Sequence, residues 1–84
     1  MNYTLRILPR AEKELGALDS KPYQAIKSNI YQLRDNPRPA GCRKLTNTRG
    51  WRLRVGDYRV VYEIDDKAKT VTVLRVGHRK EIYR

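Results

Sequence analysis

The first part of the chain changes its hydrophobic period once. Residues 2–7 alternate between polar and apolar side chains, which is typical of a half-buried β-strand, and Pro9 ends this pattern. From Arg10 the apolar positions recur at helical spacing instead, on one face of a short first helix: Ala11, Leu15 and Leu18. A strand followed by a helix is therefore expected.

A second helix is predicted directly after the first. Ser20-Lys21-Pro22 supplies a capping side chain and an early proline. The apolar stripe that follows has helical spacing: Tyr23, Ile26, Ile30 and Leu33. Asn36-Pro37 predicts the end of the helix, because the residue before a proline is excluded from the helical region. Two antiparallel helices should thus follow the first strand.

Beyond a short linker at 35–42, the pattern indicates β-structure. Arg43 to Thr46 is a weak strand, and residues 47–50 form a turn. Two strong strands come next, Trp51 to Val55 and Tyr58 to Ile64. Their spacer, Gly56-Asp57, has glycine first, as a type II′ hairpin turn requires. Thr70 to Val76 is the last strand, and Gly77 to Arg84 forms a basic tail.

The hairpin register sorts side chains onto two faces. With Gly56-Asp57 as the loop, Arg54 lies opposite Arg59, and the apolar residues of both strands face the helices. Arg52, Arg54 and Arg59 then face the other way. Directly opposed like charges destabilise a sheet by about 0.2–1 kcal/mol, so this pairing has no folding rationale and predicts a phosphate clamp. The alternative is a solvated face that discourages aggregation.

The charge balance points to a polyanionic partner. The 84 residues contain 19 Lys and Arg against 9 Asp and Glu, a net charge of +10. Residues 43–84 hold 12 of the basic and 5 of the acidic residues, and 12 of the 19 basic residues are arginines. Guanidinium matches phosphate oxygens bidentately, which favours nucleic acid over a membrane surface.

The remaining composition excludes several classes. The length predicts one domain spanning 1–84. There is no run near the ~20 apolar residues of a membrane span, and Met1–Arg6 lacks a signal-peptide pattern, so a cytoplasmic protein without a membrane partner is expected. Cys42 and His78 are the single cysteine and histidine, the carboxylates cluster only at Asp65-Asp66, and no glycine-rich phosphate loop appears. Neither a metal nor another cofactor is expected.

The tail contains the remaining candidate chemistry. Metal-independent RNA cleavage proceeds by attack of the ribose 2′-OH and needs a base, positive charge for the oxyanion and an acid for the leaving oxygen. His78 titrates nearest neutrality, and Arg79 can stabilise charge. Tyr83, an aromatic residue among basic ones, can stack on an unpaired base. A structural histidine and a packing tyrosine are the alternatives.

Two segments resemble a known family. Residues 50–64 (GWRLRVGDYRVVYEI) and 76–84 (VGHRKEIYR) resemble the RelE/ParE toxin superfamily, RelE most closely, as do PRAEKEL at 9–15 and RKL at 43–45. The resemblance implies an α+β domain of order β-α-α-β-β-β, with two N-terminal helices packed on one face of an antiparallel sheet. It also implies an endoribonuclease of a type II toxin–antitoxin pair that cuts mRNA in the ribosomal A site. A cognate acidic antitoxin would neutralise it, and operator DNA would be bound only through that antitoxin.

Carried over residue by residue, the resemblance assigns roles. Arg59 and Arg79 match phosphate-contacting arginines, and Tyr83 matches a base-stacking tyrosine, so the candidate catalytic set is Arg59, His78, Arg79 and Tyr83. The candidate nucleic-acid-binding set is Lys44, Arg52, Arg54, Lys80 and Arg84. Arg52 and Arg54 stand where well-studied RelE members have lysines. If a lysine there is the general base, either His78 takes that role or cleavage is weak, and His78→Ala is predicted to slow cleavage ~10²-fold or more.

Two other functions compete with this one. A ParE-like protein would poison DNA gyrase without cleaving nucleic acid. A nucleic-acid-binding domain without activity would result if Arg52 and Arg54 disable the base.

Overall fold

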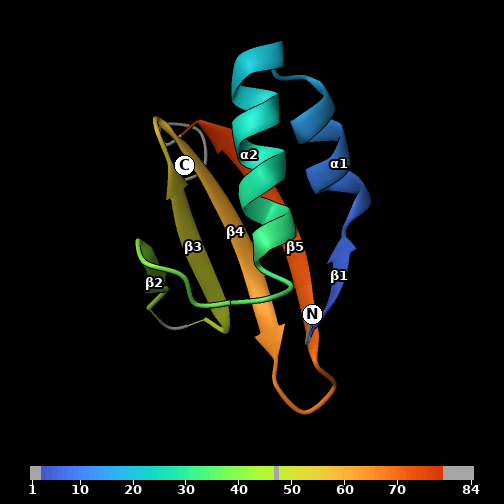
Figure 1. Cartoon of the computed structure of the whole chain (residues 1–84), viewed down its shortest axis with the longest axis vertical. Coiled ribbons are helices and arrows are strands. Elements are labelled where there is room, and N and C mark those ends of the chain that lie inside the picture. Colours follow the sequence, from blue (N-terminus) through green and yellow to red (C-terminus); the bar gives the residue numbers. More distant parts are fainter. Residues whose placement is uncertain (1–2, 47, 79–84) are drawn as a thin grey trace.

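The computed structural model describes residues 3–46 and 48–78 as one sheet with two helices packed on one of its faces (Figure 1). The elements are β1 (Thr4–Ile7), α1 (Pro9–Gly16), α2 (Ser20–Gln32), β2 (Cys42–Lys44), β3 (Gly50–Val55), β4 (Tyr58–Asp65) and β5 (Thr70–His78). The predicted α+β class is confirmed, but the sheet has one strand more than the order β-α-α-β-β-β allows. The weak strand predicted at 43–46 is present one residue earlier and shorter, as β2.

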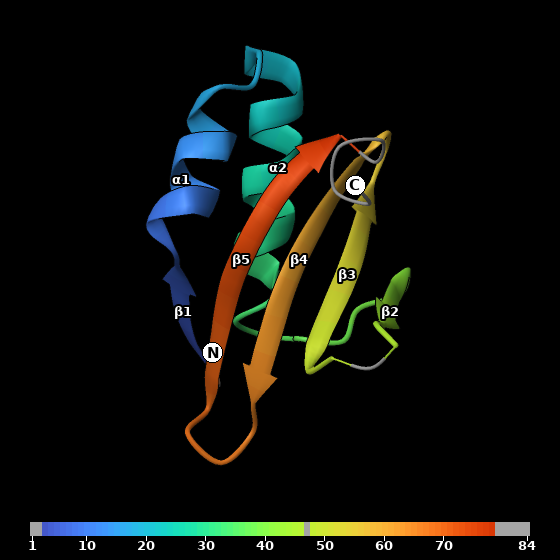
Figure 2. The same ribbon diagram turned by 180° about the vertical axis from the view of Figure 1, so that it is seen from behind.

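The sheet has the order β1-β5-β4-β3-β2 and is mixed rather than wholly antiparallel. β1 pairs with β5 in parallel, whereas every other pair is antiparallel, so the expectation of an antiparallel sheet is wrong for this one strand. The first residues of the two strands lie side by side. The N–H of Thr4, where β1 begins, donates to the carbonyl of Lys69, the residue before β5, at 2.7 Å. The opposite face of the sheet is left uncovered by the helices (Figure 2).

The core lies between the helices and the sheet. It is formed by the apolar stripes of both helices and by the inward-facing positions of the strands: Ala11, Leu15, Ile26, Ile30, Leu33, Leu53, Val60, Tyr62, Val71, Val73 and Val76. Tyr62 is fully buried, and its hydroxyl donates to the Pro37 carbonyl at 2.7 Å. Burial raises the pKa of the Tyr62 hydroxyl well above its ordinary value, so it remains a donor. This bond ties the segment after α2 to the sheet.

Both ends of α2 differ from the prediction. Asp19 is the N-cap, its side chain makes no capping bond, and Ser20 is the first helical residue, so the predicted Ser20 cap is wrong. The helix ends at Gln32 instead of near Asn36. The following residues tighten into turns, because Leu33 and Asp35 donate to carbonyls three residues earlier.

The β3–β4 hairpin has the predicted register. Arg54 lies opposite Arg59, and Gly56 has the positive φ, 59°, that the first position of a type II′ turn requires. Leu53 and Val60 are buried beneath the helices, as expected. The hairpin therefore presents its arginines on the uncovered face.

A β-bulge interrupts the pairing of β4 with β5. Tyr62 lies opposite Val73, whereas Val61 lies opposite Arg75, so Leu74 is an extra residue. The bulge reverses the side-chain alternation of β5, and Val76 consequently packs into the core.

Candidate functional site

Four arginines from three neighbouring strands gather on the uncovered face. Arg43 lies opposite Arg52, and Arg54 lies opposite Arg59. Together with Gly41 these side chains line a depression of about 440 Å³, the arginine pocket. The grouping of Arg52, Arg54 and Arg59 is as predicted from the hairpin register, and the structure adds Arg43.

Arg59 is the charged residue of the pocket that the fold buries. Its exposed fraction is 7%, and it is the one charged side chain classed as buried in residues 3–46 and 48–78. Its Nη1 donates to the Tyr58 carbonyl at 3.2 Å, but its Nε is buried and has no hydrogen-bond partner among the described residues. A buried cation with an unmade hydrogen bond is unfavourable for folding. Because Arg59 also lines the pocket, an anion there would meet a guanidinium that is already held in place.

Among residues 3–46 and 48–78, those that line the pocket are four arginines and one glycine. Each of the two cross-strand pairs places like charges directly opposite, which destabilises a sheet by about 0.2–1 kcal/mol per pair. The arrangement is therefore suited to an anion with more than one negative charge.

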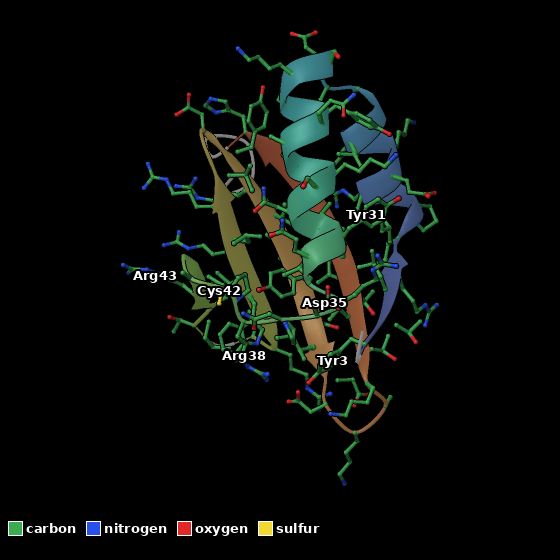
Figure 3. The ribbon with its side chains drawn as sticks, viewed as in Figure 1. Tyr3, Tyr31, Asp35, Arg38, Cys42 and Arg43 are labelled. Carbon is green, nitrogen blue, oxygen red and sulfur yellow. The ribbon has the colours of Figure 1, made fainter. Side chains whose placement is uncertain are left out.

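The segment that leads from α2 to β2 is held in place by contacts with the β4–β5 turn and with Tyr62. Arg38 forms a two-pronged ion pair with Asp66 in the β4–β5 turn, at 2.9 and 3.3 Å, and the Tyr3 hydroxyl donates to the same carboxylate at 2.7 Å. Figure 3 shows Tyr3 and Arg38 at the same end of the molecule. These two donors lower the pKa of the Asp66 carboxyl to about 2. With the Tyr62 bond to Pro37, they fix the path of the chain toward β2.

Lys44 is not part of the arginine pocket. It lies opposite Trp51, and the alternation of β3 places Trp51 on the helix-covered side. The Nζ of Lys44 donates to the Thr48 carbonyl. Arg43, one residue earlier, has its side chain on the same face of the sheet as Arg52 and lines the pocket. Sequence reasoning chose Lys44 and missed Arg43, although the alternation of the strand was a signal that could have found it.

His78 also lies apart from the pocket. It pairs with Tyr58, next to Arg59 but on the other face, and the Tyr58 and His78 rings meet edge to face at 5.6 Å between centroids. The two rings line a separate depression of about 410 Å³ with Glu14 and Leu18 on the helix-covered side. The other predicted site residues, Arg79, Lys80, Tyr83 and Arg84, lie outside the described residues.

No group of three potential metal-ligating side chains occurs within 3–46 and 48–78. In the same part of the chain, neither helix has the length and apolar character needed to cross a membrane.

Comparison with known proteins identifies the class. Residues 5–83 match the family model described as the ParE toxin of the type II toxin–antitoxin system parDE. Toxin RelG of Mycobacterium tuberculosis is 36% identical over 88 residues, covering 100% of this chain and 99% of the relative. Each comparison leads to small toxins of toxin–antitoxin pairs.

Solved structures agree with this class. The toxin–antitoxin complex RelBE2 of Mycobacterium tuberculosis matches with a TM-score of 0.83 and 30% identity, covering 94% of this chain and 100% of the other. The archaeal RelE–RelB complex of Pyrococcus horikoshii matches with a TM-score of 0.83 and 29% identity, covering 94% and 97%. This chain belongs to the RelE/ParE family of toxins of toxin–antitoxin systems.

Proposed function

We propose that this toxin is a ribosome-dependent endoribonuclease that cleaves mRNA in the ribosomal A site without a metal. The observation that carries the proposal is Arg59, a buried guanidinium that lines a pocket of arginines and whose Nε has no partner in the described part of the chain. The similarity to RelG and to RelE structures supports the same conclusion. The substrate atoms that fit the pocket are the oxygens of a phosphodiester.

The positive charge of the pocket suits a reaction in which negative charge develops on a phosphate. The ribose 2′-oxygen attacks the adjacent phosphorus as its proton leaves to a base, and the bond from phosphorus to the 5′-oxygen breaks as that oxygen gains a proton. The products are a 2′,3′-cyclic phosphate and a 5′-hydroxyl. Negative charge develops on the phosphoryl oxygens, and Arg59 would donate to them from a site where its position is already fixed. In this proposal Arg52 and Arg54 bind the backbone of the RNA.

The sequence assigns the role of general base to His78, with Arg79 as a second source of positive charge and Tyr83 as a stacking residue. The imidazole and the arginine pocket lie on opposite faces of the sheet. A scissile phosphate served by both would have to lie around the end of β4 and β5. This geometry favours catalysis dominated by charge stabilisation at Arg59.

A ParE-like inhibition of DNA gyrase is the second candidate, because the matching family model carries the ParE description. Primer extension on a translated message after induction of the toxin separates the candidates. Cuts phased with codons, lost in Arg59→Ala, support the endoribonuclease. A DNA-damage response without cuts would support gyrase as the target. If neither cuts nor a DNA-damage response is seen, a nucleic-acid-binding domain without activity is the remaining candidate.

The proposed partners follow from the family and the charge. The solved relatives are complexes of RelE toxins with RelB-type antitoxins. A chain with a net charge of +10 is complementary to an acidic neutralising segment, so we propose a cognate acidic antitoxin. Operator DNA would be reached through that antitoxin, and the cytoplasm is the proposed location.

A further inference from the structure

A second depression lies on the uncovered face, next to the β4–β5 turn. It has a volume of about 570 Å³, and we call it the Glu63 pocket. A row of directly paired residues crosses it, because Arg6 of β1 lies opposite Thr72 of β5, and Thr72 lies opposite Glu63 of β4. Leu5 and Ile7 pack against the core, so Arg6 between them faces away from the helices. Figure 2 shows the three strands of this row side by side.

The Glu63 pocket and the arginine pocket are joined along β4. Arg59, Val61 and Glu63 are alternate residues of this strand, so their side chains lie on the same face of the sheet. Successive members of the series are roughly 7 Å apart. Val61 is half-buried and places one apolar side chain between the two pockets. A single strand of RNA that lies along β4 therefore meets both pockets.

The two pockets differ in charge. In the described part of the chain, the lining of the Glu63 pocket has three acidic and three basic side chains, together with the hydroxyls of Thr70 and Thr72. A carboxylate repels a phosphate oxygen, whereas it accepts hydrogen bonds from an amino group. A balanced set of donors and acceptors suits an uncharged ligand whose edge carries both kinds of group, as the edge of a nucleobase does.

The exposed Glu63 carboxylate distinguishes between bases. Cytosine and adenine carry an amino group beside a ring nitrogen that accepts, whereas uracil has a carbonyl oxygen in place of the amino group. Glu63 can accept from the amino group while the Thr72 hydroxyl donates to the ring nitrogen. Uracil would instead place its carbonyl oxygen against the carboxylate. Contacts of this kind carry sequence information, which contacts with phosphates do not.

We propose that the Glu63 pocket binds a base of the substrate and selects cytosine or adenine over uracil, with Glu63 and Thr72 as specificity-determining residues. This inference rests on the proposed endoribonuclease activity. It adds recognition of a base to the binding of phosphate by the arginine pocket.

The test compares cleavage rates on ribosomes programmed with messages that differ by one base, cytosine or uracil, at each position of the A-site codon in turn. At one position the wild type should cleave the cytosine message about fivefold faster or more, the lower end of the discrimination that a paired base contact gives. Glu63→Gln should bring this ratio below about twofold, because an amide can donate to uracil as well as accept from cytosine. Asp65→Asn removes another carboxylate from the same pocket, and as the matched control it should keep the ratio.

Thr72 allows the same measurement without a change of charge. Thr72→Val removes the hydroxyl at nearly constant volume and should lower the ratio of the two rates, whereas Thr72→Ser keeps the hydroxyl and should preserve the ratio. Because one variant cleaves both messages, a loss of folded protein lowers both rates and leaves their ratio unchanged. Equal ratios in the wild type, Glu63→Gln and Thr72→Val would overturn the recognition of a base by this pocket.

Arg59→Ala separates the inference from the function on which it rests. This variant should slow cleavage of the two messages by a similar factor, because Arg59 contacts phosphate in the proposed function. If the wild type cleaves both messages at the same rate at every codon position, the Glu63 pocket does not read a base, while the endoribonuclease activity stands. If the wild type cleaves neither message, the proposed function fails and the inference fails with it.

Discussion

Arg59 illustrates a conflict between folding and binding within one side chain. Its guanidinium is removed from water, opposes another arginine across the strands, and leaves Nε without a partner. Each of these features opposes folding, and the charge on Arg59 becomes favourable once an anion enters the pocket. The residue is therefore expected to contribute to function at the expense of stability.

Replacing Arg59 by methionine should separate these two contributions. The free energy of unfolding should be unchanged or higher by up to about 1 kcal/mol, because the like-charge pair with Arg54 disappears. Growth inhibition on induction should be lost. Urea unfolding and a growth assay measure the two effects, and Arg54→Met, which removes the exposed member of the same pair, is the control. A clear loss of stability in Arg59→Met would contradict this interpretation.

For His78 two substitutions distinguish chemistry from packing. The imidazole contacts the Tyr58 ring on the face away from the arginine pocket, so we expect His78→Ala to slow cleavage by less than the ~10²-fold that a general base would lose. His78→Phe should retain the aromatic contact, worth about 0.5–1.5 kcal/mol, and most of the activity. Cleavage on translating ribosomes and thermal unfolding test both variants. If alanine and phenylalanine abolish cleavage equally while stability is kept, His78 is the base after all.

Among the elements, β5 has an edge that is only partly covered by another strand. β1 pairs with Thr70–Val73, and beyond that point Glu14 of α1 takes the place of a neighbouring strand. Its carboxylate accepts from the Val76 N–H at 2.9 Å and from Arg75 at 3.1 Å. This contact joins α1 to the end of the strand that leads to His78.

Glu14→Ala should therefore destabilise the fold by about 1–3 kcal/mol, since a partly buried N–H loses its acceptor. Glu14→Gln keeps an oxygen for the Val76 N–H and should recover most of that loss. Hydrogen exchange of the Val76 amide, measured by NMR, should accelerate in the alanine variant. Glu12→Ala, an exposed glutamate on the same helix, is the control, and equal effects of Glu12→Ala and Glu14→Ala would contradict the role of this contact.

The β4–β5 turn makes stability depend on pH through Asp66. Arg38 and Tyr3 lower the pKa of its carboxyl from 3.8 to about 2, so the folded state favours the charged form. The resulting stabilisation is complete above the unfolded pKa near 3.8 and is lost as pH falls through about 2. Because the pair is exposed, salt should weaken it.

Urea midpoints of the wild type and Asp66→Asn should differ by a constant amount from pH 7 to about pH 4 and converge toward pH 2. Asp57→Asn, in the other hairpin turn, controls for the loss of one carboxylate. A difference that stays constant down to pH 2 would show that the Arg38–Asp66 pair does not contribute.

The elements differ in how far the sequence predicts them. The register of the β3–β4 hairpin was predictable to the residue, because period-two alternation on both sides of Gly56 fixes register and facing together, and each strand is one residue longer than predicted at its far end. The parallel pairing of β1 with β5 was not, since the partners are distant in sequence and no local pattern links them. The bond of Tyr62 to Pro37, just after the tight turns that follow Gln32, is also a contact between distant residues.

The site was predictable where alternation is regular and unpredictable where it is interrupted. Arg52, Arg54 and Arg59 follow from the hairpin, and the regular alternation of β2 would also have given Arg43. Strict alternation from Val71 and Val73 would place His78 on the face of Arg59. The bulge at Leu74 shifts the pattern by one residue and turns His78 toward Tyr58 instead.

On the scale of the whole molecule, charge dominates. A net charge of +10 on 84 residues creates a strong positive field. In the arginine pocket, two pairs of arginines lie directly opposite each other on neighbouring strands. A multivalent anion that binds there stabilises the folded state by mass action.

Pyrophosphate should therefore raise the melting temperature more than sodium chloride does at equal ionic strength. At 100 times its dissociation constant, a bound ligand contributes about 2.7 kcal/mol. Differential scanning fluorimetry measures the shift. Arg59→Met should lose most of the increase, whereas Lys13→Met, an exposed lysine on α1, should retain it. Equal losses would point to net charge rather than to the arginine pocket.

The parallel pairing at the edge of the sheet also determines when the molecule can be completed during its own synthesis. β5 lies between β1 and β4, so the N-terminal strand has no neighbouring strand to pair with until Thr70–Val73 have been made. Contacts between such distant segments form late, because a long loop must be closed first. A protein proposed to attack translating ribosomes would thus remain incomplete, and harmless, until the ribosome that makes it has added β5.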